Sequence, residues 1–306
     1  MATIRINTDA EALLNDIDLS NLFAVPYSRN QQGVGQFTLP LKGEGTITLL
    51  VYGESLPSSL FDWLIPGQGT VSRVEFKNTA GSLLFSVALP PGNSVRQANF
   101  AQAFISGNAQ SAVNLFLIGN DTVQSSIDVT IEPFPQIENI ILANPALVAF
   151  GNQKNNRLTG NNLSNLLVGN QGADRLTGKG GADTFALGAR SSNLNATTRD
   201  VITDFRPSQG DEIQISRSLY AMPETTQLTF RAFRSTAFQD LLNGAAATSS
   251  RRFVYNLDTG ILYYNANGSS RGFGNNGGDL VELLPVGGAI PQLSSTNISN
   301  LLDLVA

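Results

Sequence analysis

The chain has 306 residues, of which 42% are hydrophobic and 14% are charged, and its formal net charge is −5 at pH 7. This hydrophobic content is too high for a disordered chain, and the length suits one large domain or two ordinary ones. Cysteine and histidine are both absent. The sequence therefore excludes disulfides, cysteine nucleophiles, Ser-His-Asp triads and histidine-ligated zinc or iron.

The negative net charge argues against nucleic acid as a partner. The four lysines also form no cluster, because they are scattered along the chain. The N-terminal sequence, MATIRINTDAEALLND, contains no continuous apolar stretch. It predicts neither a cleaved signal peptide nor insertion into a membrane. Taken alone, this N-terminus favours a cytoplasmic protein.

Residues 1–136 predict a β-rich module with short helices. Strand-like runs occur at residues 36–41, 45–52, 71–76 and 83–89, each closed by Gly, Pro or Asn. One helix is expected at residues 9–15, with Asp9 as its N-cap, and another within residues 93–116, where apolar residues recur at helical spacing. We expect a sheet with a helical cover in this part of the chain.

A nine-residue repeat runs through residues 151–186. Written in rows, it reads GNQKNNRLT, GNNLSNLLV, GNQGADRLT and GKGGADTFA. Every row begins with Gly, has Asn or Asp at its sixth position and has a large apolar residue at its eighth position. The sixth positions are Asn156, Asn165, Asp174 and Asp183, and the eighth positions are Leu158, Leu167, Leu176 and Phe185.

The repeat predicts a coil of short strands. Six residues that begin with Gly and end with Asn or Asp favour a tight turn, and the next three form a strand whose middle side chain points inward. Two rows make one coil, so Leu158 should stack on Leu176, and Leu167 on Phe185, between two parallel sheets. Stacked carboxylates at the sixth positions, together with carbonyls of the Gly turns, would line an oxygen cage of the kind that Ca²⁺ prefers.

These rows resemble the nonapeptide repeat G-G-x-G-x-D-x-U-x of the RTX, or haemolysin-type, family. The resemblance implies a central parallel β-roll, the RTX solenoid, that binds calcium. It also implies a secreted bacterial protein, and particularly a cyanobacterial one, that leaves the cell by type I secretion. The specific resemblance covers residues 137–215.

The first two rows depart from the family pattern. Their sixth positions are Asn rather than Asp, and their fourth positions are Lys154 and Leu163 where the third and fourth rows have Gly172 and Gly181. Each stacked pair at the sixth position then has a single carboxylate, which should weaken calcium binding. The alternative is a roll in which stacked Asn side chains bond to one another along the coil without any metal.

The roll is expected to continue on both sides of the four rows. Upstream, residues 137–142 look like an irregular rung or an ordinary edge strand. Downstream, residues 200–205 and 210–215 are similar to the segment that closes the roll in secreted metalloproteases of the same superfamily. That similarity implies further metal ligands, although an exposed strand with alternating Asp would give the same pattern. The predicted metal ligands are Asp174, Asp183, Asn156, Asn165, Gly172, Gly181, Asp200 and Asp204.

Residues 216–306 predict a C-terminal β module. Residues 253–264 read as a hairpin with a loop closed by Gly260, and another strand is expected at residues 279–284. The chain ends with Asp303 followed by apolar residues. In the family that it resembles, such an ending is an uncleaved export signal, so the N-terminus no longer argues for the cytoplasm.

The sequence as a whole predicts a mainly β protein without catalytic activity. We expect a calcium-binding protein of the cell surface or extracellular matrix that assembles with copies of itself, in a filament or a layer, and that has a cell-surface polysaccharide as a further partner. The low charge supports assembly, because it removes repulsion between copies. The alternatives are a calcium-dependent glycan-binding module and a secreted carbohydrate-active enzyme that carries the roll for export and folding.

Overall fold

The described part of the computed structural model is mainly β, as the sequence predicted. It describes residues 3–7, 17, 27–30, 34–43, 45–54, 56, 69–89, 94–96, 117, 120–132, 134–187, 199–216, 229–234, 251–267, 273 and 277–301. The chain divides into two compact units, Met1–Ile127 and Asp128–Ala306. Among the described residues, no helix is both long enough and apolar enough to span a bilayer.

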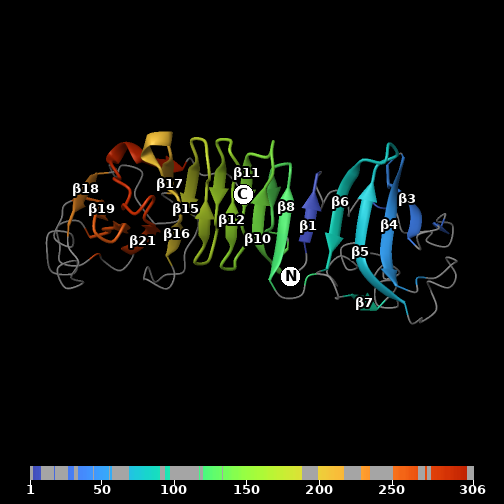
Figure 1. Cartoon of the computed structure of the whole chain (residues 1–306). Helices are drawn as coiled ribbons and strands as arrows, with labels where there is room; N and C mark the ends of the chain where they lie inside the picture. Colours follow the sequence, from blue (N-terminus) through green and yellow to red (C-terminus); the bar gives the residue numbers. More distant parts are fainter. Residues whose placement is uncertain are drawn as a thin grey trace. The chain divides into compact units, whose positions relative to one another are not determined.

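The first unit is built on one twisted sheet, whose strands are drawn from blue to green in Figure 1. Its strands run in the order β8-β1-β6-β5-β4-β3-β2, and β7 adds to β5. Neighbours are antiparallel, except that β1 and β8 are parallel. The strands are β1 (Thr3–Ile6), β2 (Tyr27–Arg29), β3 (Gly35–Pro40), β4 (Thr46–Glu54), β5 (Thr70–Lys77), β6 (Leu83–Ala88), β7 (Val95–Arg96) and β8 (Asp121–Ser125).

Alternation of side chains explains why these segments form strands with one buried face. In β4, Ile47, Leu49 and Val51 are buried, and the residues between them are half-exposed. The four strands predicted in this part of the sequence are confirmed as β3, β4, β5 and β6. The helix predicted at residues 9–15 lies outside the described residues. So does most of the region 93–116, of which only residues 94–96 are described, with Val95 and Arg96 forming β7.

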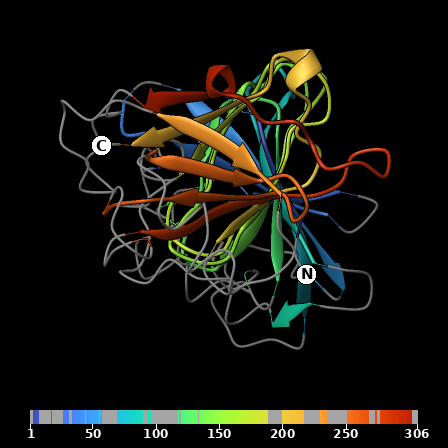
Figure 2. The same ribbon diagram turned by 90° about the vertical axis from the view of Figure 1, so that its left-hand side faces the viewer.

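The second unit contains two sheets, and the chain alternates between them as it winds. The first has the order β10-β12-β14-β16-β21-β20-β19-β18, and the second has the order β9-β11-β13-β15-β17-β22. Figure 2 looks along this unit and shows the yellow-green turns superimposed behind the orange strands. The strands of the first sheet are β10 (Ile137–Leu142), β12 (Arg157–Thr159), β14 (Arg175–Thr177), β16 (Asp200–Ile202), β18 (Phe230–Phe233), β19 (Phe253–Asn256), β20 (Ile261–Tyr264) and β21 (Gly278–Leu283).

The second sheet is parallel throughout. Its strands are β9 (Val129–Thr130), β11 (Val148–Phe150), β13 (Leu166–Val168), β15 (Thr184–Leu187), β17 (Glu212–Ser216) and β22 (Ile298–Leu301). Two 3₁₀ turns, η2 (Pro207–Gln209) and η3 (Ser295–Asn297), precede β17 and β22. From β11 onward, each strand of this sheet directly follows a strand of the first sheet along the chain.

The apolar column of the repeat forms the core between the sheets. Leu158 is in register with Leu176, and Leu167 with Phe185, and all four side chains are fully buried. Both stacking predictions are confirmed. The same column continues through Ile140 of β10, so residues 137–142 form a rung of the coil.

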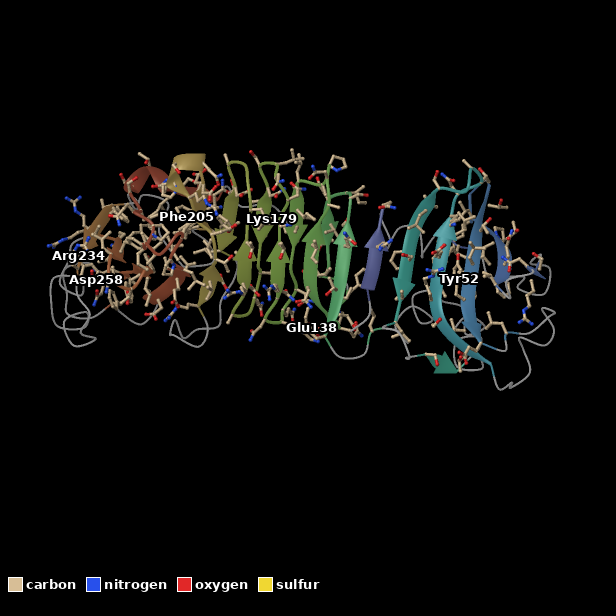
Figure 3. The ribbon with its side chains drawn as sticks, viewed as in Figure 1. Tyr52, Glu138, Lys179, Phe205, Arg234 and Asp258 are labelled. Carbon is tan, nitrogen blue, oxygen red and sulfur yellow. The ribbon has the colours of Figure 1, made fainter. Side chains whose placement is uncertain are left out.

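The coil also extends beyond the repeat. Strands β16 and β17 continue the two sheets in parallel, and Phe205, labelled in Figure 3, packs on Phe185 with ring centroids 6.0 Å apart. The predicted hairpin is present as β19 and β20, with Gly260 in the left-handed region at φ 73°. Strand β21 pairs in parallel with β16, and β22 pairs in parallel with β17. Two strands from beyond residue 216 thus pair directly with strands of the coil.

Candidate functional site

The side chains at the sixth position of each row point into the coil. Asn156, Asn165, Asp174 and Asp183 are each at most 2% exposed. The glycine that begins each row makes room for them, because a Cβ atom at Gly169 would overlap the carboxylate of Asp174. The invariant Gly of the rows is therefore explained by a close approach to the sixth side chain of the same row.

Two ladders of hydrogen bonds connect these residues along the coil. In the first ladder, the backbone N–H of Asn156 donates to Oδ1 of Asp174 (2.7 Å), and the N–H of Asp174 donates to Oδ1 of Asp200 (2.9 Å). Each side chain thus binds the backbone of the preceding coil. This arrangement differs from the ladder considered from the sequence, in which Asn side chains bond to one another.

The second ladder repeats the arrangement at the other turn of the coil. The N–H of Asn165 donates to Oδ1 of Asp183 (2.9 Å), and the N–H of Asp183 donates to Oδ1 of Asp211 (3.1 Å). Asp211 is 2% exposed and also accepts the N–H of Arg206 through Oδ2 (2.7 Å). The structure therefore places Asp174 with Asp200, and Asp183 with Asp211, at the downstream end of the ladders.

The turns of the first two rows, residues 151–156 and 160–165, hold an amide nitrogen in an oxygen cage. We call them the upstream turns. Nδ2 of Asn156 donates to the carbonyls of Ile137 (3.4 Å) and Glu138 (3.2 Å) and to Oδ1 of Asn152 (3.1 Å). Asn165 repeats this pattern with Ala146, Leu147 and Asn161, at 3.3–3.4 Å. In each upstream turn, an uncharged NH₂ group lies where three oxygens converge.

The turns of the last two rows, residues 169–174 and 178–183, have a different backbone. We call them the downstream turns. Their fourth residues, Gly172 and Gly181, have φ angles of 125° and 104°, and their second residues, Asn170 and Lys179, have φ angles of 66° and 74°. A Cβ atom at Gly172 would overlap the carbonyl of Lys154 in the preceding coil. The upstream turns contain no such left-handed residue, so they accommodate side chains at the fourth position.

A group of acidic residues closes the downstream end of the second ladder. Asp204 accepts the N–H groups of Gly178 (2.9 Å) and Lys179 (2.8 Å), and the guanidinium of Arg206 lies 3.8 Å from its carboxylate. The pKa of Asp183 is raised to about 6, mainly by burial and also by the charges of Asp211 and Asp204, while the bond from Asn165 and the charge of Arg206 act to lower it. Burial also raises the pKa of Asp211. Acidic groups are therefore concentrated at this end of the ladder, where burial makes the ionisation of Asp183 and Asp211 unfavourable.

The donor set decides how well calcium fits each turn. In the upstream turns the amide NH₂ groups already occupy the convergent oxygens, so these turns do not fit a cation. The downstream turns offer Asp174 and Asp183, whose carboxylates are the hard oxygen ligands that Ca²⁺ takes. Among the described residues, however, no three acidic side chains gather closely enough to hold a metal by themselves. Calcium at the downstream turns would need backbone carbonyls as further ligands.

Several residues of the site were not identified from the sequence. Asn152 and Asn161 accept the N–H groups of Lys154 and Leu163 through their Oδ1 atoms at 2.9 and 2.8 Å, and this stabilises the upstream turns. Both residues could have been identified from the sequence, because Asn stands at the second position of three of the four rows. Asp211 left no such signal, because it lies 28 residues after Asp183 instead of 18.

A partly buried ion-pair cluster connects the coil to the C-terminal strands. Arg199, which directly precedes β16, donates to Asp279 (2.9 Å) and to Glu282 of β21. Its side chain is 14% exposed. The carboxylates hold the pKa of the guanidinium above its usual value, although burial opposes them. This cluster stabilises the junction of β16 and β21 and leaves no group free for chemistry.

No protein-family model matches the chain, and no curated protein matches it.

Proposed function

We propose that this chain is a non-catalytic, secreted structural protein of the RTX type that assembles at the cell surface or in the extracellular matrix. The observation that supports this most directly is the register of the coil, in which residues 18 apart stack in two parallel sheets. Among the described residues, Leu and Phe side chains fill the space between the two sheets of the coil, so a substrate has no room there. Its natural role is that of a rigid spacer.

Calcium has a restricted role in this proposal. It would be held by the carboxylates of Asp174 and Asp183, with carbonyls at Gly172 and Gly181 and with Asp200 and Asp204 at the downstream margin. When bound, Ca²⁺ would neutralise acidic groups and join successive coils. The upstream coil relies on Asn156 and Asn165 in place of the ion.

The described acidic groups inside the coil support a structural role. The carboxylates of Asp174, Asp183, Asp200 and Asp211 all accept backbone N–H groups of neighbouring coils. A general acid or base needs an oxygen that can reach a substrate, whereas these side chains are at most 2% exposed. Their arrangement suits cohesion between coils.

Free strand edges support assembly. Strands β2, β18 and β22 each pair on one side only within the described residues. An unpaired edge offers N–H and C=O groups to another chain, and the few charged residues of this protein give little protection against such pairing. Head-to-tail contacts between copies would produce an open filament.

Thermal unfolding with and without a chelator tests the calcium part of the proposal. The sharpest variant is Asp174→Asn with Asp183→Asn, because Asn retains the Oδ1 acceptor of the ladder and is the residue that the upstream rows already use. We expect calcium to raise the Tm of the wild type and to leave this variant unchanged. Asp258→Asn with Glu54→Gln, which removes the same charge away from the turns, should respond like the wild type. Identical wild-type melting curves in calcium and in chelator would contradict calcium binding.

Light scattering and electron microscopy at increasing protein concentration test assembly. We expect particles that grow in millimolar calcium. A strictly monomeric protein under these conditions would contradict the assembly part of the proposal.

A further inference from the structure

Two arginines lie side by side on the outer face of the first sheet. Arg157 of β12 is in register with Arg175 of β14, and both side chains are exposed. Thr159 and Thr177 are paired in the same way two residues later, so all four side chains share one face. We call these four residues the cationic face.

The stacking of Arg157 on Arg175 is unfavourable for the sheet itself. Parallel neighbours are about 4.8 Å apart, and like charges directly opposite each other destabilise a sheet. A nearby cation of the coil does have an acidic partner. The ammonium of Lys154 lies 2.7 Å from the carboxylate of Glu138. Glu138 is labelled at the lower edge of the coil in Figure 3. Neither Arg157 nor Arg175 has an ion-pair partner among the described residues. An external anion would supply the missing counter-charge.

The geometry of the face selects the kind of anion. A guanidinium binds a carboxylate through two parallel N–H bonds, and two such forks one strand apart match carboxylates on successive units of a linear polymer. Thr177 and Thr203 are hydrogen-bonded through their hydroxyls at 2.7 Å, and they continue the face with polar groups suited to sugar hydroxyls. The described residues of this face include no aromatic ring on which a nucleic-acid base could stack.

We propose that the cationic face binds an acidic polysaccharide that carries one uronate carboxylate per sugar. This inference rests on the proposed function at the cell surface, and it identifies the polysaccharide partner expected there by its charge. The polymer lies across β12 and β14, with carboxylates on Arg157 and Arg175 and with hydroxyls near Thr159 and Thr177. The net charge of −5 on the whole protein restricts such binding to this local patch.

Binding of short galacturonate oligomers, too short to gel, tests the proposal by calorimetry in calcium and in chelator. We expect binding that weakens with salt, and at least about a tenfold loss of affinity in Arg157→Gln with Arg175→Gln, in line with two lost charge-assisted contacts. The matched control is Arg29→Gln with Arg231→Gln, which removes the same charge from exposed strand arginines elsewhere and should bind like the wild type. Arg157→Lys with Arg175→Lys retains the charge but loses the forks, and it should bind with intermediate affinity.

The inference would be overturned by no binding of the wild type, by an equal loss of affinity in the control variant, or by equal binding of neutral dextran oligomers. Tighter binding of a single-stranded DNA oligonucleotide than of galacturonate would also overturn it. Melting curves of each variant verify that the coil is folded. The outcome is independent of the calcium and assembly experiments, so this inference can fail while the proposed function stands, and the reverse also holds.

Discussion

The amide of Asn165 illustrates how a neutral side chain can take the place of an ion. Its Oδ1 accepts the N–H of Asn161 (2.8 Å), and its Nδ2 faces two carbonyls and a side-chain oxygen. An amide is suited to this place because it carries both an acceptor and two donors. The interior of each upstream turn is therefore filled by an uncharged amide and needs no counter-ion.

Truncation of this side chain should be costly. Asn165→Ala leaves the N–H of Asn161 buried without its acceptor, and we expect the free energy of unfolding to fall by about 2–3 kcal/mol. Urea unfolding followed by circular dichroism measures the loss. Asn162→Ala is the control, because Asn162 is exposed in the same turn, and its effect should stay below about 0.5 kcal/mol. Equal effects of the two variants would show that the amide does not hold the turn.

Asp183 should make the metal-free protein sensitive to pH. Its pKa is raised from 3.8 to about 6, with burial as the main cause and with Asp211, Asp204 and Arg206 as the charges around it. The unfolded chain then binds fewer protons than the folded chain in this window, so stability falls as pH rises between about 4 and 6. Melting in chelator across that range should show the fall, and Asp183→Asn should reduce it. An unchanged slope in that variant would assign the effect to other groups.

At the scale of the element, the two classes of turn impose different demands on the fourth position of a row. The downstream turns place this residue at positive φ against the carbonyl of the preceding coil, whereas the upstream turns carry Lys154 and Leu163 there. A single consensus for the repeat thus conceals two local structures.

Gly172→Ala should reveal the difference. The new Cβ atom would overlap the Lys154 carbonyl at an unfavourable φ of 125°, and we expect a loss of about 2–3 kcal/mol in the free energy of unfolding. Lys154→Ala, at the same position of the upstream row, removes one exposed ion pair with Glu138 and should cost at most about 1 kcal/mol. Comparable losses in denaturant titrations of the two variants would contradict the assignment of two turn classes.

At the scale of the whole molecule, regular spacing determined what could be predicted from the sequence. The columns of Gly, Asx and Leu specified the turns, the core and the register, because each recurs every nine residues. The continuation through Asp200 and Asp211 breaks that period, with intervals of 26 and 28 residues in place of 18. The return of β21 and β22 to the coil lies even farther along the chain, where no periodic signal remains.

The atoms that each Asx side chain binds could not be predicted in the same way. Stacking of Asn156 over Asp174 follows from the period, but it is compatible with a metal, with side-chain pairs or with bonds to the backbone. The choice depends on the distance between coils and on the direction of the N–H groups, which follow from the whole sheet. The arginine pair was present in the rows as well, yet its meaning emerges only once β12 and β14 are seen to be neighbours in register.

The register of the coil has a consequence for how such a protein can change in length during evolution. A duplication of one row would move every later strand to the opposite sheet, whereas a duplication of two rows adds one complete coil and lengthens the molecule by about 4.8 Å. The first and third rows end in Arg-Leu-Thr, and the second and fourth rows do not. A duplication of two neighbouring rows therefore copies one Arg-Leu-Thr strand and adds one arginine to the cationic face. Length and the number of anchoring charges would grow together, and a longer variant would hold its polymer through more contacts at once.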